Sequence, residues 1–197
     1  MWVSAGSPTE VELGEGWTSI ATSAFQSTNI TSVVIPASVT TLEDSAFYLA
    51  GSLASVTFSP NSELAIIKTS VFRGTNIRNI IIPASVTNIG MACFNDCPVL
   101  TTITFIESAD SAVGVTIGSY NINNVFNGSN ALDYVFIKIG QVIKNSSGTQ
   151  INTTLDTTGA FFGSPATTTI TSNKAVEVFF TRQSSATWQY FYMSDWS

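Results

Sequence analysis

The sequence of 197 residues contains no histidine and carries little charge. Because histidine is the commonest general base, its absence excludes Ser-His and Cys-His nucleophile pairs and every metal site that uses imidazole. Charged residues make up 10% of the chain, whereas about 25% is usual. The low charge predicts a surface of neutral polar groups, which the 26 serines and 26 threonines can supply.

Basic residues are scarcer than acidic ones and are unevenly placed. The chain has seven Lys and Arg against 13 Asp and Glu, and residues 1–67 carry six acids and no base. Nucleic-acid binding needs clustered Lys and Arg, so no nucleic-acid partner is expected. No apolar run approaches the roughly 18 to 20 residues of a membrane span, so membrane insertion is not expected either.

The chain has only two cysteines, Cys93 and Cys97, which are four positions apart. Two thiols without histidine fall short of a structural zinc site, and the spacing differs from the C-x-x-C redox motif. We therefore expect small buried residues and no metal. Phosphate-binding, calcium-binding and serine-hydrolase motifs are also missing from the sequence, so we expect no cofactor, no catalytic residue and no enzyme.

A repeat organises the first two thirds of the chain. Residues 28–47 align with residues 75–94 at a distance of 47, and ten of the twenty positions are identical. Apolar triplets with the spacing x, x+3, x+5 divide this distance into two shorter units. The triplets are Ile30/Val33/Ile35, Leu53/Val56/Phe58, Ile77/Ile80/Ile82, Leu100/Ile103/Phe105 and Leu132/Val135/Ile137.

One unit of about 23 residues thus has too little apolar surface to fold alone, so neighbouring units must cover it. The β-branched triplets predict a parallel ladder of short strands. Pro36 and Pro83 should end their strands, because proline cannot donate to the ladder. The fold class that we predict is mainly β, a leucine-rich-repeat solenoid followed by a small antiparallel β module.

The repeated I-P-A-S-V-T, with Ser85, Val86, Phe94 and Cys97 in place, resembles the BspA-type leucine-rich repeat over roughly residues 17–140. In that family the repeats are scaffold and recognition surface. They occur in bacterial and protist surface proteins and in proteins of large viruses. The resemblance implies no catalytic motif.

An insertion of about nine residues departs from the repeat between Phe105 and Leu132. Insertions in repeat proteins emerge on one face and often bind partners, although a simple spacer loop is the commoner case. Tyr120 and Asn121 in this segment are candidate interaction residues.

The repeat pattern stops after Gly140, and a segment rich in Thr, Ser and Asn follows. Val176, Val178 and Phe180 alternate with polar residues and predict an antiparallel hairpin whose loop lies near 182–187. One face of its last strand carries Trp188, Tyr190 and Tyr192, which are candidate interaction residues. They are consistent with a sugar-stacking platform, but more often such residues form a core or a subunit interface. This tail weakly resembles terminal β modules of viral fibre and capsid-associated proteins.

The sequence predicts three parts: an N-terminal cap at 1–16, a solenoid at 17–140 and a C-terminal β module at 141–197. The first hypothesis for function is a structural component of a virion surface or capsid, with other subunits as partners. It depends on the low charge, on the two resemblances and on the missing secretory leader. The alternative is a cell-surface adhesin that binds a host protein or a glycan.

Overall fold

The computed structural model describes residues 9–105 without a gap, and beyond them residues 115–117, 129, 131, 134–137, 143–144, 154–156, 167–169, 177–184 and 187–193. These residues contain strands and turns and no helix. The strands of the repeat region are β1 (Glu10–Glu12), β2 (Ser19–Ile20), β3 (Ser32–Ile35), β4 (Thr41–Leu42), β5 (Ser55–Phe58), β6 (Ile66–Ile67), β7 (Asn79–Ile82), β8 (Asn88–Ile89), β9 (Thr102–Phe105), β10 (Val115–Ile117), β11 (Tyr134–Ile137) and β12 (Ile143–Lys144).

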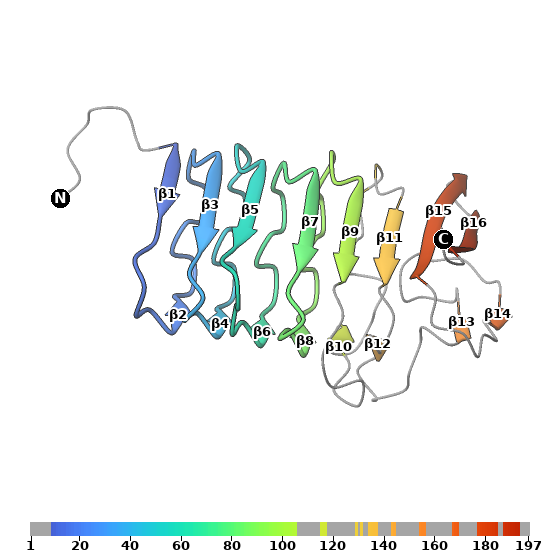
Figure 1. The fold of residues 1–197 in the computed structure, drawn as a ribbon. Helices are drawn as coiled ribbons and strands as arrows, with labels where there is room; N and C mark the ends of the chain where they lie inside the picture. The colour runs from blue at the N-terminus through green and yellow to red at the C-terminus, as the bar shows by residue number, and fades with distance from the viewer. Residues whose placement is uncertain are drawn as a thin grey trace.

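The repeat units stack in one direction into a solenoid (Figure 1). The odd-numbered strands β1 to β11 lie side by side and form the front of the solenoid. The short even-numbered strands β2 to β12 form a six-stranded parallel sheet along the lower side of the solenoid in Figure 1, which we call the back sheet. The predicted parallel β-solenoid is confirmed, and β3 and β7 end at the residues that precede Pro36 and Pro83.

The front strands pair in register, so equivalent residues of successive units face each other. Val11 lies opposite Val33 and Val33 opposite Val56, and Ile80 lies opposite Ile103. The ladder is interrupted once, between β5 and β7, where the strands belong to separate sheets. The interruption coincides with a step of 24 residues between triplets, one more than the step before it.

The core consists of columns of identical or similar residues, one from each unit. One column is a stack of phenylalanine rings, Phe25, Phe47, Phe72 and Phe94, with successive centroids 5.2, 5.5 and 5.5 Å apart. The rings are close to parallel, with interplanar angles of 4°, 10° and 18°. Each unit therefore buries its apolar face against the next one, as the short repeat requires.

The turn that carries each phenylalanine uses two left-handed residues, four positions apart. Their φ angles lie between 54° and 73°, and they are Ser23 and Ser27, Ser45 and Leu49, Ser70 and Gly74, and Ala92 and Asp96. This backbone directs amide groups at the next unit: Phe25, Phe47 and Phe72 each donate from N–H to a carbonyl one unit further on. The turns are thus hydrogen-bonded from unit to unit like the two sheets.

The N-terminal residues that we expected to cap the solenoid include β1, which pairs with β3 in parallel. The expected insertion includes β10, which takes a place in the back sheet between β8 and β12. Part of the insertion therefore continues the solenoid and does not form a loop.

Four further strands follow: β13 (Thr154–Asp156), β14 (Thr167–Thr169), β15 (Glu177–Ser184) and β16 (Thr187–Met193). The strands β15 and β16 are antiparallel, and β15 also pairs with β11. The hairpin strands continue into the segment 182–187, which we had expected to be the loop. The separate β module at 141–197 stays a prediction.

Candidate functional site

The front of the solenoid presents two rows of outward side chains, because residues alternate between the core and the surface along each strand. The first row follows the first residue of each strand and is polar: Glu10, Ser32, Ser55, Asn79 and Thr102. The second row follows the third residue of each strand: Glu12, Val34, Thr57, Ile81 and Thr104. We call these ten residues the front face.

Beyond β1, the front face carries no charge and is rich in β-branched side chains. Ile81 is 58% exposed and Val34 is 42% exposed, whereas the neighbouring Ile80 and Val33 are buried. An exposed isoleucine contributes nothing to the core, so it is available for contacts with another molecule. The outward positions of β1 to β9 hold no aromatic residue.

Threonine hydroxyls fix the front face at its upper border. Thr31 donates from Oγ1 to the carbonyl of Thr9, and Thr101 donates to the carbonyl of Arg78, over 2.8 and 3.1 Å. The Thr101 hydroxyl also lies 3.0 Å from Oδ1 of Asn79. Each bond joins one unit to the unit before it, so these threonines hold the front face in a fixed shape.

Threonine hydroxyls also join neighbouring units at the back sheet. Thr40 and Thr87 donate from Oγ1 to the carbonyls of Thr18 and Ala65, over 3.0 and 3.2 Å. Among the residues of β2, β4, β6 and β8, the most exposed apolar side chain is that of Ile66, at 36%. The abundant threonine is thus partly explained by hydrogen bonds between units.

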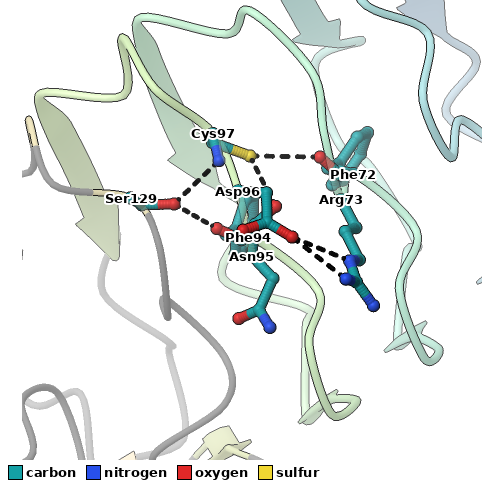
Figure 2. A network of polar contacts seen from close by, with 7 residues as sticks. All are labelled: Phe72, Arg73, Phe94, Asn95, Asp96, Cys97 and Ser129. Carbon is teal, nitrogen blue, oxygen red and sulfur yellow. Dashed lines mark hydrogen bonds and ion pairs between the residues drawn. The ribbon is translucent and has the colours of Figure 1, made fainter.

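Figure 2 shows a polar network on the turn side of the last complete unit. Ser129 accepts a hydrogen bond from the N–H of Cys97 and donates to the carbonyl of Phe94, over 3.0 and 2.5 Å. The thiol of Cys97 donates to the carbonyl of Phe72 over 3.2 Å. Ser129 lies 32 residues after Cys97 and continues a column that Thr28, Ala50 and Thr75 begin. It is a structural residue that was not predicted from the sequence, because the insertion before it shifts it from the spacing of the other units.

Both cysteines are free and fully buried, as expected. Burial raises the pKa of the Cys93 thiol and also that of the Cys97 thiol, because the ionised form would lose its hydration. Hydrogen bonds from Thr75 and Ser129 act in the opposite direction on Cys97 and do not outweigh burial. These thiols therefore stay protonated and pack as small core residues.

The described part of the chain has two ion pairs, both on the surface. Arg73 contacts Asp96 over 3.0 Å, and its guanidinium lies 5.8 Å from the ring centroid of Tyr48. Lys68 contacts Glu43 over 2.5 Å, and this contact raises the pKa of Lys68. Both pairs join neighbouring units, which is a structural role.

Among the residues that the structure describes, no group of three or more His, Cys, Asp or Glu is arranged to hold a metal ion. A search of the same residues for a helix of the length and hydropathy needed to span a bilayer found none.

The interaction residues predicted from sequence, Trp188, Tyr190, Tyr192, Tyr120 and Asn121, stay a prediction. Trp188, Tyr190 and Tyr192 occupy alternate positions of β16, opposite Arg182, Phe180 and Val178 of β15. Their side chains lie outside the described part of the chain, and so do Tyr120 and Asn121 entirely. The front face was not among the sites predicted from sequence. A signal was present, because Val34 and Ile81 are apolar residues between two inward-facing positions of the repeated triplets.

The sequence pattern described as "BspA type Leucine rich repeat region" matches the chain in six copies, over residues 18–138. A search of curated proteins found no match.

Several solved structures are similar to the chain. The leucine-rich repeat protein of T. pallidum is 23% identical, covers 64% of this chain and has a TM-score of 0.50. A leucine-rich repeat protein from Bacteroides capillosus is 34% identical over 42% of this chain, with a TM-score of 0.35. A leucine rich cell surface protein from Faecalibacterium prausnitzii is 17% identical over 93% of this chain, with a TM-score of 0.41. The chain spans 57%, 65% and 54% of the lengths of these proteins, respectively.

Proposed function

Because the chain belongs to the BspA-type leucine-rich repeat family, we propose that it is a non-catalytic protein that binds a protein partner with the front face of its solenoid. The observation that carries this proposal is the row of uncharged outward residues Val34, Thr57, Ile81 and Thr104, of which the first three are exposed. Strands β3 and β5 hold two of them in one parallel ladder, and β7 and β9 hold the other two in a second ladder.

Beyond β1, the preformed and uncharged front face suits protein recognition for two reasons. Its strands are held by ladder hydrogen bonds on either side of the interruption between β5 and β7, so little conformational entropy is lost when a partner binds. Its apolar side chains are already exposed, and charged residues are depleted at the centres of protein interfaces. Ile81, as the most exposed of these side chains, is the expected anchor.

A protein partner is favoured over a glycan by the composition of the front face. Sugar recognition commonly uses an aromatic ring against which the apolar face of the sugar can pack, as aromatic side chains combine a large apolar surface with a polar edge. The outward positions of β1 to β9 carry Ser, Thr, Asn, Val, Ile and Glu and no aromatic ring.

The setting that we propose is the cell surface, with a host surface protein as the partner. The virion hypothesis depends on assembly through solenoid and aromatic surfaces, and the side chains of Trp188, Tyr190 and Tyr192 are outside the described part of the chain. The front face supports a binding role that needs no such assembly. In this proposal residues 17–140 are the solenoid and 141–197 the β module. Residues 1–16, which we expected to be a cap, supply the terminal strand β1 to the ladder.

Site-specific photo-cross-linking can test the proposal before the partner is known. A photoreactive amino acid replaces Ile81 in the full chain, in cells that naturally make the protein and are in contact with their host. The matched control carries the same amino acid at Ile66, which is also an exposed isoleucine but lies on the back sheet. We expect one defined protein adduct from position 81 and none from position 66.

Adducts from both positions, or only from position 66, would contradict binding through the front face. A protein adduct from position 81 that consists only of further copies of this chain would support an assembly instead of an adhesin. A defined host protein identifies the partner and allows its affinity to be measured.

A further inference from the structure

Among the residues that the structure describes, no strand covers the outer side of the first solenoid unit. Strand β1 pairs with β3, and no described residue pairs with its other edge. Val11 and Phe25 are only partly buried there, whereas Val33 and Phe47, the next residues in the same columns, are buried. An extended segment added beside β1 would continue the ladder and cover this apolar end.

Trp17 also lies at this N-terminal end of the solenoid and is exposed there. Its column continues with Val39, Leu64 and Val86, because hydrogen bonds link the residues that follow each of them from unit to unit. These three residues are at most 1% exposed, whereas Trp17 is 63% exposed. An exposed tryptophan in an otherwise buried column indicates that a further layer can pack on it.

The charges on this edge determine what kind of segment fits. Glu10 and Glu12 are both exposed on β1, and the described residues contain no ion pair for either of them. Residues 9–67 contain no Lys or Arg that could compensate them. Opposite charges placed directly across a strand pair stabilise it, and like charges destabilise it.

We propose that β1 is a docking edge for an extended segment of a different protein, in which two basic residues flank one apolar residue. The basic residues would lie opposite Glu10 and Glu12 on the front, and the apolar residue would lie opposite Val11 at the open end of the core. Backbone hydrogen bonds supply affinity in this type of recognition, and the alternate side chains supply specificity.

The same charges disfavour a second copy of these 197 residues as the occupant. Pairing β1 with β1 of a second copy sets glutamates against glutamates. No two of the seven Lys and Arg in the sequence are two positions apart, so no segment of this chain has the required pattern. Residues 1–8 contain no basic residue at all. The edge site is independent of the proposed binding through Val34 and Ile81, and its failure would leave that proposal standing.

A short synthetic peptide tests the docking edge on the full chain. The probe is a blocked nonapeptide with Lys-Val-Lys at its centre, and its controls have Glu-Val-Glu or Lys-Pro-Lys there. Binding is measured by calorimetry, and amide hydrogen exchange reports on β1. We expect the Lys-Val-Lys peptide alone to bind and to slow exchange in β1.

Variants of the protein identify the carboxylates involved. The double variant Glu10→Gln/Glu12→Gln should bind the Lys-Val-Lys peptide about 2- to 30-fold more weakly, which corresponds to two cross-strand charge pairs. Glu63→Gln removes an exposed carboxylate elsewhere in the acidic half and should leave the affinity unchanged.

Three results would overturn the proposal: no binding of the Lys-Val-Lys peptide, equal binding of the Glu-Val-Glu peptide, or an unchanged affinity of the double variant. A fourth is slow exchange of all β1 amides in the free chain, because it would mean that another segment, such as residues 1–8, already occupies the edge.

Discussion

Position 90 carries glycine because the neighbouring unit leaves no room for a side chain. A Cβ atom at Gly90 would lie 2.5 Å from the carbonyl carbon of Lys68 and 2.6 Å from the nitrogen of Thr69. Both are backbone atoms, so relief requires the two units to move apart. The other units have Ala21, Glu43 and Lys68 at this position, which shows that the close approach is local to this pair of units.

Gly90→Ala should therefore destabilise the protein by about 1–3 kcal/mol through overpacking. Gly51→Ala is the matched control, because a Cβ at Gly51 meets no atom within 4 Å. Urea denaturation followed by circular dichroism measures both variants. Equal midpoints for the two alanine variants would show that the units are not as close at Gly90 as described.

The two buried thiols make stability depend on pH. Burial raises the pKa of Cys93 and Cys97 in the native state, so they stay protonated while the unfolded chain ionises its thiols above about pH 8.5. The unfolded state then binds fewer protons, and stability falls as the pH rises. Each thiol contributes a decrease of up to about 1.4 kcal/mol per pH unit.

The variant Cys93→Ala/Cys97→Ala tests this dependence, because alanine already occupies the same columns at Ala46 and Ala50. The free energy of unfolding should fall more steeply in the unchanged protein than in the variant between roughly pH 8 and pH 10. Parallel curves for the two proteins would contradict the burial of protonated thiols.

Some structural features of single residues could not be predicted from the sequence. The run Ile80, Ile81 and Ile82 is uniformly apolar, so composition does not reveal that the middle residue is exposed; alternation along a strand does. Four of the eight left-handed turn residues are serine and only one is glycine, so no local signal predicts them. Ser129 was hidden by the insertion before it.

At the scale of an element, the phenylalanine column carries much of the cohesion between units. Phe72 lies between Phe47 and Phe94, with both ring centroids 5.5 Å away, and it is fully buried. Phe25 has one ring neighbour and is partly exposed at the open end. Both positions carry phenylalanine, but Phe72 packs between two neighbouring rings and Phe25 against one.

Phe72→Ala should cost about 3–5 kcal/mol, and Phe25→Ala should cost clearly less, because the end of the column leaves a smaller cavity. Thermal and urea unfolding of both variants measure the difference. If Phe25→Ala is as destabilising as Phe72→Ala, then the first unit is covered by a further layer in the free protein.

The strands were easier to predict than their connections. The spacing of apolar triplets placed β3, β5, β7 and β9 correctly, because each buried strand repeats the pattern of its neighbour. The spacing did not predict the interruption between β5 and β7, since it depends on backbone geometry. It also did not reveal β10, because the extra residues of the insertion shift this strand away from the position at which its counterparts β8 and β12 follow β7 and β11.

At the scale of the whole molecule, the architecture follows from repetition. Each unit contacts the units before and after it, and hydrogen bonds run along the front, the back and the turn side. The fold class was predictable because six copies of one pattern reinforce each other. The role was less predictable, because function depends on surface residues that vary between copies.

The same arrangement separates two surfaces with different chemistry. The front face beyond β1 is uncharged, whereas the N-terminal edge is acidic and carries the exposed Trp17 beside the partly buried Val11 and Phe25. Different residues carry the two binding proposals, so the proposals can be tested independently. Charge changes at Glu10 and Glu12 address the edge, and apolar changes address the front face.

The most direct test of the central claim is the affinity of the cross-linked partner for Ile81→Asp compared with Ile66→Asp. Both changes put a carboxylate in place of an exposed isoleucine, but only the first lies on the front face. We predict that Ile81→Asp weakens binding about tenfold or more, as expected for an interface anchor, and that Ile66→Asp leaves it unchanged. Equal affinities of the two variants would contradict binding through the front face.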